Sequence, residues 1–208
     1  MRTDRPLMIV PMIAAKLHEV HHDGTSDCIG EKKESYITYC DFNDNTRPLC
    51  DWKQHCEGQD HGDWIRAKSS TPSHTTGPDG DYPDGNGYYL YQEATNFIPN
   101  DAVRLDSPKL DISNDVCVEF WYHMSGSETQ NELRVLILDE KGQTVYWKQT
   151  GAQSSYWLYG YFTYQPKQQT SIQVLFVAVR GLTEYGDTAI DNIGVKNGPC
   201  GKYSYTWG

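Results

Sequence analysis

Short runs in which apolar and polar side chains alternate limit the fold of this chain most strongly. In residues 116–123, Val118 and Phe120 fall on one face and Glu119 on the other, a period typical of a β-strand with one buried face. No segment keeps an apolar stripe at the helical period over three turns, so a helical bundle is excluded. The sequence predicts an all-β fold, an antiparallel β-sandwich of jelly-roll type. Further strands are expected at 133–138, 156–164, 172–179 and 188–195.

A long surface loop is expected between the N-terminal third of the chain and these strands. Residues 69–87 are rich in proline and glycine and contain no aliphatic side chain, a composition typical of successive turns. Residues 16–38 are also polar and irregular.

The charge balance and the length of the apolar runs each exclude one class of function. The chain of 208 residues has 18 basic and 28 acidic side chains, a net charge of −10. A protein that follows nucleic-acid phosphates needs a basic face, so no nucleic acid is expected as a partner. No apolar run approaches the ~20 residues of a membrane-spanning helix, so no transmembrane segment is predicted in this chain.

The six cysteines favour disulfides. Their number is even, no CxxC pair occurs, and their spacing resembles no zinc site. Buried reduced thiols in a cytosolic protein are the alternative, but disulfides in a secreted protein or a membrane-protein ectodomain are the better prediction. The cysteines are Cys28, Cys40, Cys50, Cys56, Cys117 and Cys200.

The N-terminus offers a weak signal-peptide pattern. Basic residues precede a short apolar run, and a cleavage near Ala15 would remove residues 1–15. The alternatives are a frayed tail and an ill-defined start of a longer chain.

No catalytic motif has the context that its chemistry requires. The run His18–His22 matches HExxH, but no amphipathic helix carries it, so a chance match is the preferred interpretation. His55 beside Cys56 is the nearest approach to a nucleophile and base, and neither GxSxG nor a nucleotide-binding glycine motif occurs. Paired carboxylates of the glycosidase type are not excluded by spacing, yet nothing singles out a pair. No enzyme is predicted.

An ordered series of sequence blocks resembles the MAM domain, named for meprin, neuropilin and the receptor tyrosine phosphatase mu. The resemblance covers residues 40–200 and leaves an N-terminal tail, 1–39, and a C-terminal tail, 201–208. The blocks include CDFN at 40–43, LCDW at 49–52, TGPDGD at 76–81, GYYLY at 87–91, LDSP at 105–108, CVEFWYHMSG at 117–126 and GDTAIDNI at 186–193.

The resemblance implies an extracellular, non-enzymatic module for protein–protein recognition, cell adhesion or self-association, with a homophilic or heterophilic protein partner and a possible homo-oligomer. Two alternatives stay open. One is a jelly-roll carbohydrate-binding module that stacks sugars on Trp157, Tyr159 and Tyr161; the other is an accessory domain of a meprin-like metalloprotease. The aromatic residues 120–122 are expected in the core. Candidate contact residues are Tyr82, Tyr88, Tyr89, Tyr156, Tyr159 and Tyr161.

The resemblance also implies a disulfide pattern and a cation site. It pairs Cys40 with Cys50 and Cys117 with Cys200, which leaves Cys28 and Cys56 as a third bridge. The family's glutamate after CDF is replaced here by Asn43, which weakens a structural calcium site. The alternative is that these carboxylates are solvated turn residues. The expected calcium ligands are Asp41, Asn43, Asp79, Asp81 and Asp191.

Overall fold

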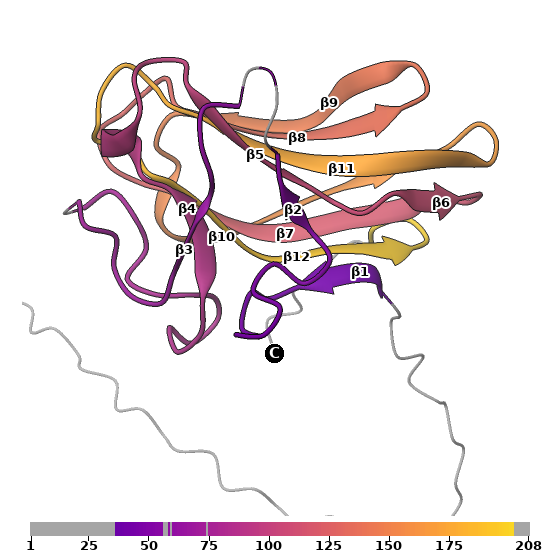
Figure 1. Cartoon of the computed structure of the whole chain (residues 1–208), viewed down its shortest axis with the longest axis horizontal. Coiled ribbons are helices and arrows are strands. Elements are labelled where there is room, and N and C mark those ends of the chain that lie inside the picture. The colour runs from indigo at the N-terminus through magenta and orange to yellow at the C-terminus, as the bar shows by residue number, and fades with distance from the viewer. Residues whose placement is uncertain (1–35, 56–57, 59, 74, 202–208) are drawn as a thin grey trace, which may run out of the picture. The chain divides into compact units, whose positions relative to one another are not determined.

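Two antiparallel sheets of six strands each form the part of the chain that the computed structural model describes, residues 36–55, 58, 60–73 and 75–201. The sheets lie face to face as two layers (Figure 1). This arrangement confirms the predicted all-β sandwich. The strands are β1 (Tyr36–Cys40), β2 (Lys53–Gln54), β3 (Ile65–Ala67), β4 (Tyr89–Gln92), β5 (Ala102–Asp106), β6 (Leu110–Ile112), β7 (Val116–Met124), β8 (Glu132–Asp139), β9 (Gly142–Thr150), β10 (Ser154–Tyr164), β11 (Thr170–Val179) and β12 (Thr188–Asn197), with one 3₁₀ turn, η1 (Ala94–Asn96).

The order of strands in each sheet differs from their order in the chain. The first sheet runs β10-β7-β12-β4-β3, and β1 pairs with β12 beside this path. The second sheet runs β2-β5-β11-β8-β9, and β6 pairs with β11. The chain therefore passes repeatedly from one layer to the other, although the pairs β3/β4, β5/β6 and β8/β9 each stay in one sheet. The first and last strands become neighbours, as expected of a jelly roll.

The core lies between the sheets and is built from alternate residues of their central strands. Phe120 of β7 meets Phe176 of β11 edge to face, with ring centroids 5.0 Å apart, and both are fully buried. Tyr122 joins this core, as expected. Trp121 does not, because its position in β7 places it on the outer face of the first sheet, where its ring stacks on Tyr82.

The expected long loop is present between β3 and β4. Among its described residues no strand occurs from Ser69 to Gly87. The loop is tied to the outer face of the first sheet, since Asp187 and Asp191 accept hydrogen bonds from Thr76 Oγ1 and the Tyr82 amide.

The described part of the chain contains two disulfides, Cys40–Cys50 and Cys117–Cys200. They are the pairs that the family resemblance implies. Cys28, Cys56, the HExxH match and residues 1–15 lie outside the described residues, as do residues 202–208. None of the helical segments that the structure describes has the length and apolar character needed to span a membrane.

Candidate functional site

The outer face of the first sheet carries an aromatic face, made of Tyr36, Tyr39, Tyr82, Trp121, Tyr159 and Tyr161. Alternation along β7 and β10 turns Trp121, Tyr159 and Tyr161 outward. Tyr82, from the long loop, stacks on Trp121 with ring centroids 3.5 Å apart and ring planes 14° apart. Tyr159 then continues the row to Tyr161, with centroids 5.4 Å apart at each step.

A buried ion pair holds part of this aromatic face in place. Glu119 of β7 is 5% exposed and accepts hydrogen bonds from the hydroxyls of Tyr36 and Tyr159. Lys196 Nζ lies 3.0 Å from the same carboxylate. Burial opposes ionisation, but these hydrogen bonds outweigh it and lower the pKa of Glu119. The tyrosines are thus held by a charged anchor, while Tyr36, Tyr39 and Tyr161 keep 38%, 41% and 46% of their surface exposed.

Other tyrosines expected at a contact surface are distributed differently. Tyr89 is fully buried and donates its hydroxyl to the Ser69 carbonyl. Tyr88 lies under the guanidinium of Arg66, 3.5 Å from its ring centroid. Tyr156 is 78% exposed on β10. Tyr36 and Tyr39 were not predicted, because Tyr36 falls in the segment expected to be irregular, 16–38, and Tyr39 directly follows it.

The three aromatic residues proposed to stack on sugars do not share one exposed plane. Trp157 is half-buried, donates its indole N–H to the Gly80 carbonyl, and packs edge-on against Tyr89. Tyr159 and Tyr161 are tilted by 31° to each other. A flat sugar-stacking surface is therefore not formed by this set.

An acidic cluster borders the aromatic face, and it contains four of the five expected calcium ligands: Asp41, Asn43, Asp81 and Asp191. Asp191 is fully buried and accepts hydrogen bonds from the amides of Tyr82, at 2.8 Å, and Asn192, at 2.7 Å. Burial raises its pKa to about 8, and the charges of Asp81 and Asp41 add to this shift.

Glycine at position 87 allows the rest of the acidic cluster to come together. Asp81 accepts a hydrogen bond from the Gly87 amide at 2.8 Å, and Asn43 accepts one from the Tyr88 amide at 2.6 Å. A Cβ atom on Gly87 would lie 2.2 Å from Asn43 Oδ1 and 2.3 Å from Asp81 Oδ2. The two side-chain oxygens therefore converge on one small space that any larger residue would fill.

Asp79 lies elsewhere. Its carboxylate accepts a hydrogen bond from Ser70 Oγ at 3.3 Å and borders a polar hollow together with Gly77 and Ser125. Within the described part of the chain, no three side chains of the types His, Cys, Asp and Glu are grouped as a metal site. The three carboxylates and one amide oxygen of the acidic cluster are donors of the hard type that calcium prefers, but they are not gathered closely enough to form such a group.

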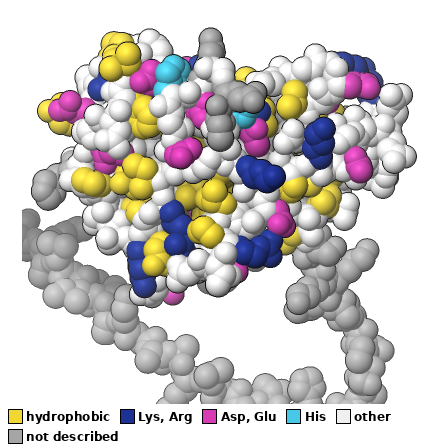
Figure 2. All heavy atoms as spheres, in the orientation of Figure 1, with side chains coloured by type: hydrophobic (Ala, Val, Ile, Leu, Met, Phe, Trp, Pro, Cys, Tyr) yellow, Lys and Arg dark blue, Asp and Glu magenta, His cyan; other side chains and the backbone are white. Residues whose placement is uncertain are grey.

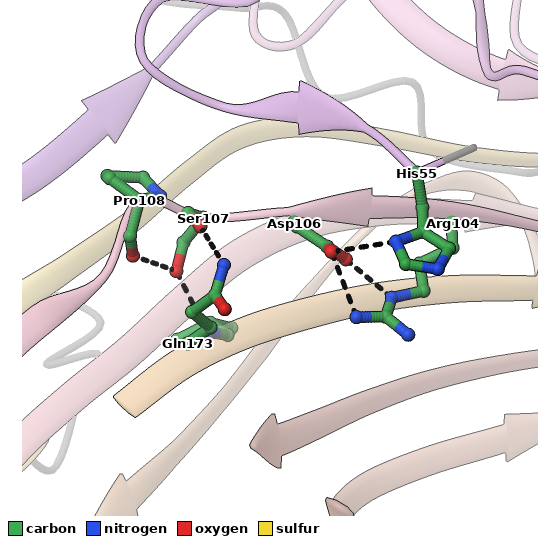
Figure 3. A network of polar contacts seen from close by, with 7 residues as sticks. His55, Arg104, Asp106, Ser107, Pro108 and Gln173 are labelled. Carbon is green, nitrogen blue, oxygen red and sulfur yellow. Dashed lines mark hydrogen bonds and ion pairs between the residues drawn. The ribbon is translucent and has the colours of Figure 1, made fainter. Parts of the chain in front are cut away.

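A second polar network lies on the outer face of the second sheet (Figure 3). His55 Nδ1 is 3.1 Å from Asp106, and Arg104 binds both oxygens of that carboxylate at 2.5 and 2.9 Å. The nearby hydroxyl of Ser107 donates to the Pro108 carbonyl and accepts from the Val174 amide. Because each group is used by its neighbours, this network is a structural tie between β2, β5 and β11.

The surface seen in Figure 2 carries hydrophobic side chains that are scattered among charged and polar ones. It shows no single large apolar patch. A hollow of about 470 Å³ beside the Asp106 network is lined by His55, His61, Arg104 and Arg134, among others.

Comparison with known proteins identifies close relatives of this sequence. A family model described as "MAM domain, meprin/A5/mu" matches residues 40–201. Thyroid hormone-induced protein B of Xenopus laevis is 39% identical over 165 residues, 77% of this chain and 23% of the relative. Zonadhesin of Mus musculus is 35% identical over 172 residues, 81% of this chain and 3% of the relative. Neuropilin-1a of Danio rerio is 30% identical over 163 residues, 74% of this chain and 17% of the relative. The chain thus spans less than a quarter of the length of each of these relatives.

Among solved structures, the K1 cleaved adhesin domain of Lys-gingipain from Porphyromonas gingivalis superposes with a TM-score of 0.51 at 14% identity, covering 77% of this chain and 98% of that one. A xylan-binding domain from Paenibacillus barcinonensis has a TM-score of 0.49 at 10% identity, covering 78% of this chain and 94% of that one. At 14% identity the likeness to the adhesin domain concerns the fold alone.

Proposed function

This chain belongs to the MAM (meprin/A5/mu) domain family, and from that premise we propose that residues 40–200 are an extracellular, non-enzymatic module that recognises another protein. The observation that carries the proposal is the aromatic face. Tyrosine and tryptophan supply large contact areas at low entropic cost, and here they are held by stacking and by the Glu119 anchor. A rigid, half-exposed aromatic surface is suited to binding a protein.

The two disulfides support an extracellular location. Cys40–Cys50 fastens the end of β1, and Cys117–Cys200 ties β7 to the residues after β12. Disulfides persist in oxidising compartments and are rare in the cytosol. Cell adhesion or assembly of a parent molecule is the finer role that fits a module of this kind.

The proposal is tested with a fluorescent, tetramerised form of the chain that is used to stain cells. Tyr161→Arg places a charge at the exposed end of the aromatic face. Tyr185→Arg is the control, since Tyr185 is 55% exposed on the loop between β11 and β12 and is not one of the residues of this face. We expect Y161R to lose staining and Y185R to keep it. Protease treatment of the cells should remove staining, whereas equal staining by both variants would contradict the proposal.

The same assay separates the carbohydrate alternative. If glycosidase treatment of the cells removes staining and protease treatment does not, the ligand is a glycan. The tilt of Tyr159 and Tyr161 and the burial of Trp157 argue against this outcome. The role of an accessory domain in a meprin-like metalloprotease differs only in the parent protein and uses the same contact surface.

We also propose self-association through the aromatic face as one form of this recognition. Sedimentation velocity of the purified chain over a range of concentrations should show a dimer that Y161R weakens and Y185R does not. A monomer at all concentrations would leave a heterophilic partner as the target of the staining assay.

A structural calcium ion in the acidic cluster would connect this cluster to the aromatic face. Asp191 holds the Tyr82 amide, and Asn192 accepts a hydrogen bond from Tyr39 at 2.5 Å. A divalent cation beside Asp191, Asp81 and Asp41 would favour their ionised forms. It would thereby fix two residues of the contact surface, so chelation should weaken staining as well as stability.

A further inference from the structure

The outer edge of β10 is the one long sheet edge among the described strands that carries no charged side chain. β10 ends the first sheet and pairs with β7 on one side only. Its eleven residues read SSYWLYGYFTY. In a strand that is paired on one side, every second residue points its N–H and C=O groups away from the sheet. Such an edge is open to another strand unless a charge, a proline, a bulge or a covering segment protects it.

The other described strands at sheet edges are short or charged. β1 has five residues and a register shift between Tyr36 and Thr38. β3 and β6 have three residues each and β2 has two, and each of them includes a charged side chain. β9 is long but includes Lys148. Shortness, bulges and charges are the devices by which sheets avoid pairing at their edges, so the edge of β10 differs from the rest.

Most of β10 is regular and accessible. Its register with β7 shifts between Ser154 and Leu158 and then continues without a break to Tyr164. Within this regular part the residues 158, 159, 162 and 163 are half-buried, and Tyr161 keeps 46% of its surface exposed. A further strand could therefore pair with β10 without displacing any strand of the described fold.

The sequence of the regular part is nearly symmetric about one glycine. Residues 158–162 read LYGYF, so Gly160 has a tyrosine on each side and a large apolar residue beyond each tyrosine. Two antiparallel copies of β10 that cross at Gly160 would oppose Tyr159 with Tyr161, and Leu158 with Phe162. Directly opposed residues point to the same face of a sheet, so the tyrosines would stay on the outer face and the apolar residues on the core side. A slip by one residue would bring the two faces into conflict.

We propose that the outer edge of β10 pairs with the same edge of a second copy of this chain, so that two first sheets join into one antiparallel sheet about a two-fold axis at Gly160. The inference rests on the self-association proposed above and names the strand that carries it. A symmetric contact uses the same surface on both copies, and the near-symmetric sequence suits both halves of it. Because β10 has no charged side chain, no like charges oppose each other across the axis. The Tyr159 and Tyr161 rings of both copies gather on the outer face.

Disulfide cross-linking between two different variants tests the register. Tyr159→Cys in one copy and Tyr161→Cys in the other place the thiols on directly opposed residues, with Cβ atoms about 5 Å apart. In either variant alone the two thiols are diagonal neighbours, roughly 7–8 Å apart, too far for a disulfide without backbone movement. We expect a mixture of Y159C and Y161C in an oxidising buffer to form cross-linked dimer at least about tenfold faster than either variant alone. The control mixture is Y161C with Y185C, since Tyr185 is also exposed but lies outside β10. It should cross-link no faster than the single variants.

Hydrogen exchange of the unmodified chain separates edge pairing from contact between two aromatic faces. Edge pairing engages every second backbone amide of residues 158–162, whereas contact between faces engages side chains. We expect these amides to exchange about tenfold more slowly once the concentration is high enough for dimers to form. The amides of β9, the other long edge strand, should keep their rates.

Two results would overturn the edge pairing and leave contact through the aromatic face as the mode of self-association. One is a dimer whose β10 amides gain no protection, and the other is a mixture of Y159C and Y161C that cross-links no faster than the single variants. A monomer at all concentrations would also overturn it, while the staining assay still tests recognition of another protein. Circular dichroism of each cysteine variant verifies that it is folded.

Discussion

Two buried glutamates near one end of the sandwich, Glu128 and Glu93, are each 3% exposed but differ in their hydrogen-bond donors. Glu128 packs against Gly186, the residue before Asp187. Its Oε1 accepts from the amides of residues 129 and 130, and its Oε2 accepts from the amide and hydroxyl of Thr183. Burial opposes ionisation, but hydrogen bonds, those from Thr183 first, lower the pKa of Glu128 to about 2.

Glu93 has three donors on one oxygen and none on the other. Burial alone therefore does not decide whether a carboxylate is ionised. Four well-placed donors make the ionised form of Glu128 stable without an ion. Glu93 is equally buried, but it has an unpaired oxygen and a second carboxylate nearby, so its negative charge is not compensated by donors alone.

The largest effect is expected when the donors of Glu128 lose their acceptor. In Glu128→Gln the new amide group cannot accept the hydrogen bonds that one oxygen now receives, so partly buried N–H groups lose their acceptor. We expect a loss of roughly 3 kcal/mol in the free energy of unfolding, about 6–12 °C in melting temperature for a domain of this size. Thermal melts should show the loss equally with calcium and with chelator. Recovery of E128Q by calcium would contradict the distinction between the two glutamates.

The pH dependence of unfolding provides the next largest effect. Because the pKa of Glu128 falls to about 2 in the folded chain, below its ordinary value of 4.5, its contribution is fully present above about pH 4.5. It is lost as the pH falls towards 2, a change of roughly 2 to 3 kcal/mol. The difference in stability between wild type and E128Q should therefore shrink over this range, as measured by denaturant unfolding at each pH. A constant difference from pH 5 to pH 2 would show that the pKa is not lowered.

The strands of the core could be predicted from the sequence because their alternation is local. The expected segments 116–123 and 172–179 lie within β7 and β11. β9 was not predicted, because all of its residues are exposed or half-buried at an edge of the second sheet, so that it has no buried alternating face. Alternation also does not say which face is inner when both are aromatic, which is why Trp121 was wrongly expected in the core.

The candidate site residues also include some that the sequence indicated and some that it did not. The family resemblance named Asp41, Asn43, Asp81 and Asp191, and the structure places them together. Asp187 stands in one sequence block of the family and Glu93 follows another by two residues, but nothing local shows that they meet. Their proximity depends on the pairing of Gln92 with Thr188, and the shortage of donors depends on how the 69–87 loop folds over them.

A smaller effect is expected from changing the charge of the acidic cluster. Asn43→Glu restores the residue that the family pattern has at this position and adds a charged calcium ligand. We expect the calcium-dependent rise in melting temperature to grow by about 2–4 °C relative to wild type, equivalent to ~1 kcal/mol. In chelator the variant should melt below wild type, since a further carboxylate adds repulsion beside Asp191. Identical melting curves with calcium and chelator for both proteins would end the calcium proposal for this cluster.

The smallest effect is expected for a carboxylate whose charge is balanced by exposed cations. Glu132 of β8 lies beside Arg134 and 2.5 Å from Lys148 Nζ on β9. The Lys148 side chain is 44% exposed, so water and salt already screen its charge. We expect Lys148→Gln to cost less than about 1 kcal/mol, and the cost should fall further at high ionic strength. Denaturant unfolding in low and high salt measures both. If K148Q lost as much stability as E128Q, neither the number of donors nor the exposure of the partner groups would predict the stability that each carboxylate contributes. The expected order places the partly buried amide donors of Glu128 first and exposed cations last. An N–H group that is held against the protein and loses its acceptor regains less hydration than a released lysine, which returns to water.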